Sequence, residues 1–123
     1  MFNISFNGVI TVNRGDSFEF PVTLNLGTNL LPRYHTMDTN SVVYLGVMEP
    51  NHPFEDALIR KRYTVEDTDE KGRVIVKFKP QDTQCVLPGK YYYQIKLQVC
   101  NPNDASDYEV YTVIDKTQFF ITE

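Results

Sequence analysis

Apolar side chains recur at every second residue along most of this chain. In residues 17–24 the alternating set is Phe18, Phe20, Val22 and Leu24, and the residues between them are mostly polar. A period of two places one set of side chains on one face of a β-strand, so this segment is expected to be a half-buried strand.

The same alternation predicts strands along the rest of the chain. Asn7-Gly8 separates two short runs and favours a type I′ hairpin turn. Pro21 cannot donate to a sheet ladder, so its strand is expected at an edge or a bulge. The last two runs form either a closing hairpin or one bulged strand. Besides 17–24, the expected strands are residues 2–6, 9–12, 41–48, 57–65, 73–79, 89–100, 108–115 and 117–122.

These runs give seven to nine short strands and no helix of any length. The 123 residues are the size of one domain, and Tyr and Phe, eight of each, favour strands over helices. Short strands at spacings of roughly 8–15 residues are typical of a β-sandwich. The sequence therefore predicts an all-β fold, an immunoglobulin-like antiparallel β-sandwich that forms a single domain over residues 1–123.

Two tyrosines support that fold. Tyr91 follows "LPGK", the place where immunoglobulin-like domains often carry a corner tyrosine whose hydroxyl binds the backbone. Tyr93 stands where an antibody domain would have its second cysteine, so packed aromatic rings are expected in place of an inter-sheet disulfide.

The order of these signals resembles the immunoglobulin-like domain at the N-terminus of upper baseplate proteins, found in phages of Gram-positive bacteria. The matching segments are "NRGDSFEFPVTL", "SVVYLGVMEP", "KGRVIVKFKPQDTQCVLPGKYYYQIKL" and "YEVYTVIDKTQFFIT". The similarity spans roughly residues 9–122. It implies a structural protein of a phage or prophage particle, in the baseplate, tail or neck.

Arg14-Gly15-Asp16-Ser17 spells the tetrapeptide by which integrins grip some matrix proteins. The motif joins two predicted strands. Glycine tolerates positive φ and aspartate caps the backbone, so Gly-Asp is also common turn chemistry. We interpret the motif as a hairpin turn and not as an adhesive site.

Charge and hydropathy limit the partners. The formal charge of −4 disfavours nucleic-acid binding. No apolar run approaches the roughly 20 residues that span a bilayer, and the N-terminus lacks the features of a signal peptide. Cys85 and Cys100 flank one predicted strand about 35 Å long, too far for a disulfide. We expect free thiols and a protein made in a host cytoplasm and assembled into a virion.

No group of residues predicts catalysis, a cofactor or a metal. The acidic run Glu66, Asp67, Asp69 and Glu70 lacks the distal glutamate of a calcium loop and is interpreted as a solvated turn. His35 and His52 have no metal-ligand spacing. No nucleophile motif surrounds the candidate hydroxyl and thiol groups, which are Ser5, Ser17, Ser41, Ser106 and Cys100.

Two outward tyrosines leave one question open. Tyr44 and Tyr92 alternate with inward residues, so they are either exposed for protein or carbohydrate contacts or covered by another segment.

The leading hypothesis is a non-enzymatic virion adaptor that docks on other virion proteins or on itself in a ring. The alternatives are a capsid decoration or head-fibre protein, and a carbohydrate- or receptor-binding module.

Overall fold

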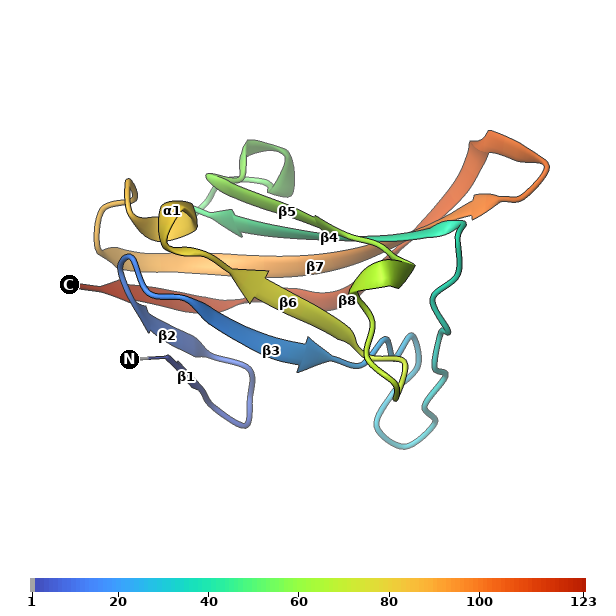
Figure 1. The fold of residues 1–123 in the computed structure, drawn as a ribbon, viewed down its shortest axis with the longest axis horizontal. Helices are drawn as coiled ribbons and strands as arrows, with labels where there is room; N and C mark the ends of the chain where they lie inside the picture. Colours follow the sequence, from blue (N-terminus) through green and yellow to red (C-terminus); the bar gives the residue numbers. More distant parts are fainter. Residues whose placement is uncertain (1) are drawn as a thin grey trace.

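Strands dominate the computed structural model, which describes residues 2–123 (Figure 1). They take up 52% of the chain against 8% in helices, which confirms the all-β prediction. Met1, the first residue of the expected domain, lies outside the described residues. The helical segments are single turns: η1 (Phe54–Asp56), η2 (Val65–Asp67) and α1 (Pro80–Thr83).

The strands form one large sheet and one small one. The large sheet has six strands in the order β1-β2-β8-β7-β4-β5, and the small sheet pairs β3 with β6. In chain order the strands are β1 (Asn3–Ile4), β2 (Ile10–Asn13), β3 (Phe18–Val22), β4 (Ser41–Met48), β5 (Ile59–Tyr63), β6 (Val74–Phe78), β7 (Gly89–Asn101) and β8 (Asp104–Thr122). Figure 1 shows β3 and β6 lying across one face of the large sheet.

The large sheet is mixed, whereas the sequence predicted an antiparallel arrangement. Strand β2 runs parallel to the end of β8, with Ile10 opposite Phe119. The physical reason lies in the turn after β2, which carries the chain across to β3 in the other sheet. Strand β2 therefore has no following hairpin partner, and its free edge pairs with the last residues of the chain.

Aromatic rings join the two sheets. Phe18 of β3 stacks on Phe78 of β6, with ring centroids 4.5 Å apart, and Phe78 lies 5.8 Å from Phe119 of β8. Tyr93 of β7 packs edge-on against Phe119 at 6.1 Å. Rings therefore fill the space between β7 and the small sheet, as the sequence predicted for Tyr93.

Tyrosine hydroxyls anchor this core to the backbone. The Tyr91 hydroxyl donates to the carbonyl of Leu87 at 2.5 Å, which confirms the predicted corner contact. The Tyr93 hydroxyl donates to the carbonyl of Gly8 at 2.6 Å, and burial raises the pKa of Tyr93 to about 12. Burial also raises the pKa of Tyr63, whose hydroxyl donates to the carbonyl of Lys77.

The first turn, the last strand and the loop before that strand show how the structure compares with three local predictions. Gly8 has positive φ but Asn7 does not, and the Gly8 amide donates to the carbonyl of Ser5, so the first turn is not type I′. The final segment is one bulged strand, β8, with register shifts opposite Tyr93 and Ile95. The predicted loop at 101–107 contains one further pair, Asn101 with Asp104, and the register shifts between that pair and the next one, Cys100 with Tyr108.

Candidate functional site

A pocket of about 460 Å³ opens between β4, η1 and β5. Gly46 makes room for it, because the segment after β4 folds back over the sheet at this point. A Cβ atom at Gly46 would lie 3.0 Å from the Phe54 ring and 3.1 Å from the Ala57 methyl group. The absent side chain therefore lets Phe54 lie close to the sheet, and the ring forms an apolar wall of the pocket.

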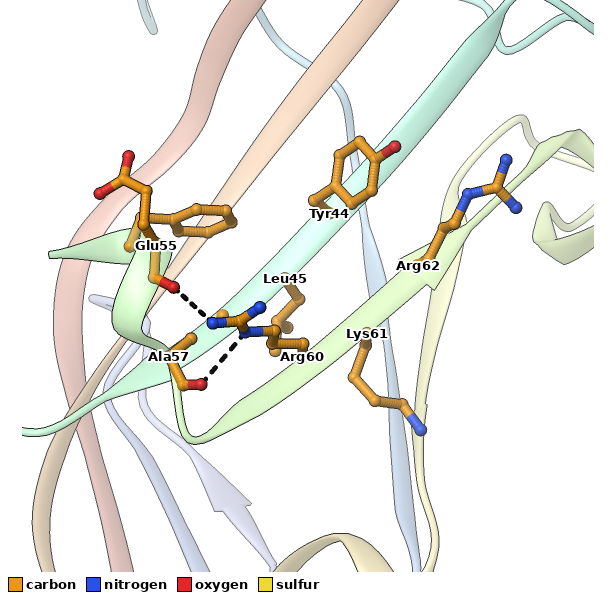
Figure 2. A pocket seen from close by; sticks show the side chains of 9 residues that line it. Tyr44, Leu45, Glu55, Ala57, Arg60, Lys61 and Arg62 are labelled. Carbon is orange, nitrogen blue, oxygen red and sulfur yellow. Dashed lines mark hydrogen bonds between the residues drawn. The ribbon is translucent and has the colours of Figure 1, made fainter.

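Cationic side chains surround this apolar wall (Figure 2). The Arg60 guanidinium donates to the carbonyls of Glu55 and Ala57, which fixes its position without neutralising its charge. The Lys96 ammonium lies 5.0 Å from the centre of the Phe54 ring. Arg62 is exposed and makes no hydrogen bond or ion pair within the part of the chain that the structure describes.

The two middle residues of β5 point to opposite sides. Figure 2 shows Arg62 on the pocket side and Lys61 projecting the other way. The Lys61 ammonium forms an ion pair of 3.0 Å with Asp82. Its charge is therefore satisfied inside the molecule, and only Arg60 and Arg62 present β5's positive charge to the pocket.

The structure answers the question about the outward tyrosines. Tyr44 is half-buried and lines the pocket, opposite Arg62 on β5 and Lys96 on β7. Tyr92 is also half-buried, and the Lys90 ammonium lies 5.5 Å from its ring centre. Both rings are partly covered, and Tyr44 alone lines this pocket.

Strand β5 is an outer edge of the large sheet. It pairs with β4 on one side, and no strand of residues 2–123 pairs with its other side. Three consecutive cations, Arg60, Lys61 and Arg62, occupy this edge. Charged side chains on an edge strand discourage the addition of another strand, so a strand that pairs here needs acidic side chains to offset these charges.

A hairpin arm made of the end of β7 and the start of β8 extends past the rest of the molecule (Figure 1). Every residue from 101 to 110 is exposed, including Tyr108 and Val110 at 54% and 51%. The arm carries three acidic residues, Asp104, Asp107 and Glu109, and no Lys or Arg lies between Lys96 and Lys116. It is an acidic, ordered projection that the chain itself does not bury.

The RGD motif is a turn, as predicted, but not a hairpin turn. The Asp16 amide donates to the carbonyl of Asn13, and Gly15 has a φ of 84°. The Gly15 amide also donates to the Thr83 hydroxyl at 2.8 Å. Arg14 forms an ion pair of 2.9 Å with Glu123. These contacts hold the motif against the body of the molecule, where it links β2 of the large sheet to β3 of the small one.

The acidic run at 66–70 bonds to its own turn. The Asp67 carboxylate accepts from the Thr64 amide at 2.8 Å and caps η2. The Asp69 carboxylate accepts from the backbone of Lys71 and Arg73 and forms an ion pair of 2.8 Å with Arg73. Desolvation opposes ionisation of Asp69, but these contacts outweigh it and lower the pKa of its carboxyl group. Glu66 and Glu70 are exposed.

One contact that sequence reasoning missed brings a serine, a histidine and an aspartate together. The buried Ser41 hydroxyl donates to Asp38 at 2.9 Å and lies 2.8 Å from His35 Nε2. Because its proton goes to Asp38, the hydroxyl accepts from Nε2–H. In a catalytic triad the histidine instead takes the serine proton and the aspartate binds the histidine. Here the two hydrogen bonds instead hold together residues 35–41, the segment that leads into β4.

The remaining residues considered as nucleophiles or metal ligands lie apart from one another. Ser5, Ser17 and Ser106 are exposed, and His52 is near Glu49 at 3.6 Å. Both cysteines are free thiols, as predicted. Within residues 2–123, no cluster of three or more His, Cys, Asp or Glu side chains could hold a metal ion. No helix in this range is long and apolar enough to cross a membrane.

Comparison with protein families, with curated proteins and with solved structures finds no match to this chain.

Proposed function

We propose that this chain is a non-enzymatic structural adaptor of a phage or prophage particle, located in the baseplate, tail or neck. It is an immunoglobulin-like module that docks on other virion proteins or on copies of itself. The order of strands and the Tyr91 corner contact support the immunoglobulin-like part of the proposal. The resemblance of residues 9–122 to upper baseplate domains supports the virion part.

One observation carries the docking function: the exposed arm at the β7–β8 hairpin. The arm keeps strand pairing although it is exposed: Cys100 pairs with Tyr108, and Val99 pairs with Glu109. Exposed Tyr108 and Val110 add apolar surface to it. Tyrosine and other aromatic residues are enriched where proteins bind one another. A paired, exposed strand is also a surface that a partner strand can extend.

The pocket favours a second candidate, a carbohydrate-binding module on the virion surface. Tyr44 and Phe54 offer rings against which a sugar can stack, and Arg60 and Arg62 offer hydrogen-bond donors. A third candidate, a capsid decoration or head-fibre protein, uses the same docking surfaces on a different part of the particle.

Affinity capture from a lysate of phage-infected cells tests the adaptor function. The tagged full chain is expected to retain baseplate, tail or neck proteins, identified by mass spectrometry. A variant with a shortened arm, in which Asn-Gly replaces residues 100–108, is the matched control and is expected to retain less of them. Retention of capsid proteins alone would favour the decoration candidate, and glycan-array binding without any virion protein would favour the carbohydrate candidate.

A further inference from the structure

The acidic arm and the basic edge of β5 are complementary surfaces on one chain. The arm has three carboxylates and no basic residue. The β5 edge has Arg60 and Arg62, with no acid between Asp56 and Glu66, while its third cation, Lys61, is paired with Asp82. The chain as a whole carries a net charge of −4, so the basic edge is a local exception. Opposite charges on two surfaces steer encounters between them and fix their register.

The two surfaces cannot meet within one molecule. Tyr44 of the pocket lies opposite Lys96 of β7. Six residues of extended strand, about 20 Å, separate Lys96 from Pro102 at the tip of the arm. The arm extends past the ends of the other strands of the sheet (Figure 1), so it does not lie along its own β5 edge. Complementary surfaces that cannot meet in one chain can meet between two.

Both surfaces have free backbone groups for strand pairing. On its outer side, β8 pairs with β2 only from Phe119 to Thr122. From Asp104 to Gln118 that side has no strand partner within residues 2–123. The far side of β5 is equally free. An edge strand of one copy can therefore add to the edge strand of another by main-chain hydrogen bonds.

The charges also match in spacing. Asp107 and Glu109 are two residues apart at the start of β8, and Arg60 and Arg62 are two residues apart on β5. An antiparallel alignment that sets Asp107 opposite Arg62 also sets Glu109 opposite Arg60. Directly opposed residues on paired strands have Cβ atoms about 4.5–5.5 Å apart, close enough for ion pairs.

Other groups near the arm do not cancel its charge. The Arg33 guanidinium lies 6.0 Å from the centre of the Tyr111 ring at the base of the arm. The Tyr111 hydroxyl donates to the Glu109 carboxylate, and the Asn101 amide donates to Asp107 at 3.2 Å. Neither Asp107 nor Glu109 forms an ion pair among the described residues.

We propose that the acidic arm of one copy docks on the basic β5 edge of the next, so that the chain assembles head to tail. Such a contact uses two different surfaces of each copy, and it gives a closed ring where the rotation between copies closes and an open filament where it does not. The proposal deepens the proposed function and rests on it, because it names the self-contact through which the adaptor assembles.

Charge reversal on each surface tests this contact in the full chain. The variant R60E/R62E keeps an acidic arm and gains an acidic edge, and D107R/E109R keeps a basic edge and gains a basic arm. By sedimentation velocity, each variant alone is expected to self-associate on the order of 100-fold more weakly than the native chain. An equimolar mixture is expected to regain association, because each arm then meets an edge of opposite charge.

Two control variants make the same changes in net charge elsewhere. K71E/K77E matches R60E/R62E, and E66R/E70R matches D107R/E109R; all four control positions are exposed. Both controls are expected to associate like the native chain, and circular dichroism checks that every variant folds. Association of the native chain is also expected to weaken as salt is raised, because salt screens the ion pairs.

The outcomes separate this proposal from the proposed function. A native chain that stays monomeric at all concentrations, or that associates regardless of both charge reversals, overturns the head-to-tail contact. If that monomer still captures virion proteins, the adaptor function stands. If it captures none, the adaptor function falls as well.

Discussion

At the scale of single residues, tyrosine hydroxyls hold the core to the backbone. Tyr91 lies where the sequence predicted a corner tyrosine, and its hydroxyl binds the carbonyl of Leu87. Sequence reasoning placed Tyr93 inward but could not find its partner, because Gly8 is 85 residues away along the chain. A local pattern reveals the face of a strand, whereas a distant hydrogen bond depends on the fold.

The corner contact gives the first prediction. Tyr91→Phe removes the hydroxyl and keeps the ring, so the free energy of unfolding is expected to fall by about 1 kcal/mol, the usual net value of one hydrogen bond. Urea denaturation measures this loss. Tyr92→Phe is the matched control, since the Tyr92 hydroxyl has no hydrogen bond within residues 2–123, and its stability is expected to stay native. Equal losses in both variants would contradict a role for the corner contact.

The second prediction concerns alkaline pH. Burial raises the pKa of Tyr93 to about 12, above the value of about 10 in an unfolded chain. Between these values the unfolded state releases its proton and the folded state keeps it, so stability is expected to fall as pH rises from about 10 to about 12. Urea denaturation across this pH range measures the slope, and Tyr93→Phe is expected to reduce it. Tyr63 contributes in the same direction, so part of the slope remains.

At the scale of elements, alternation found the strands but not all their ends. The inward faces of β3, β6 and β7 match the predicted apolar sets, and β4 is a central strand as predicted. The sequence missed the arm because residues 101–107, NPNDASD, consist of turn-forming and polar residues. Only the pairs Asn101 with Asp104 and Cys100 with Tyr108 tie this stretch to β7. These pairs depend on the hairpin as a whole.

Shortening the arm gives the third prediction. Replacing residues 100–108 with Asn-Gly leaves Val99 opposite Glu109, joined by a two-residue turn. The change removes no buried side chain, so the free energy of unfolding is expected to change by no more than about 1 kcal/mol. Thermal and urea unfolding measure this. A variant that fails to fold would show that the arm supports the body, against the exposure of residues 101–110.

At the scale of the whole molecule, aromatic rings join the two sheets. Phe18 of the small sheet stacks on Phe78 within that sheet and on Phe2, at centroid distances of 4.5 and 4.6 Å, and it lies 6.4 Å from Phe119 of the large sheet. The small sheet has only two strands, so side-chain packing against the large sheet must hold it in place.

This packing gives the fourth prediction. Phe18→Ala is expected to reduce the free energy of unfolding by about 3–5 kcal/mol, through lost burial and the cavity that remains. Phe6→Ala is the matched control, because Phe6 is fully exposed at 105%, and it is expected to change stability by less than about 0.5 kcal/mol. Urea denaturation compares the two. A small loss for Phe18→Ala would mean that the small sheet is held by something other than these rings.

The sequence by itself determined the all-β class, the inward faces of the strands, the turn at Arg14-Gly15 and the free thiols. These follow from local rules, since side-chain alternation, glycine at positive φ and strand length need no knowledge of distant residues. The sequence also shows the charges of the arm and of β5, but it does not show where these two segments lie in the fold.

Only the tertiary structure decided the parallel pairing of β2 with β8, the pocket and the edge position of β5. Each depends on residues far apart in sequence: Ile10 meets Phe119, and Phe54 folds back over Gly46. A period of two shows on which face of a strand a side chain lies. It does not show which other strand lies beside it. Which strands become neighbours is decided by how the whole chain buries its apolar faces at once.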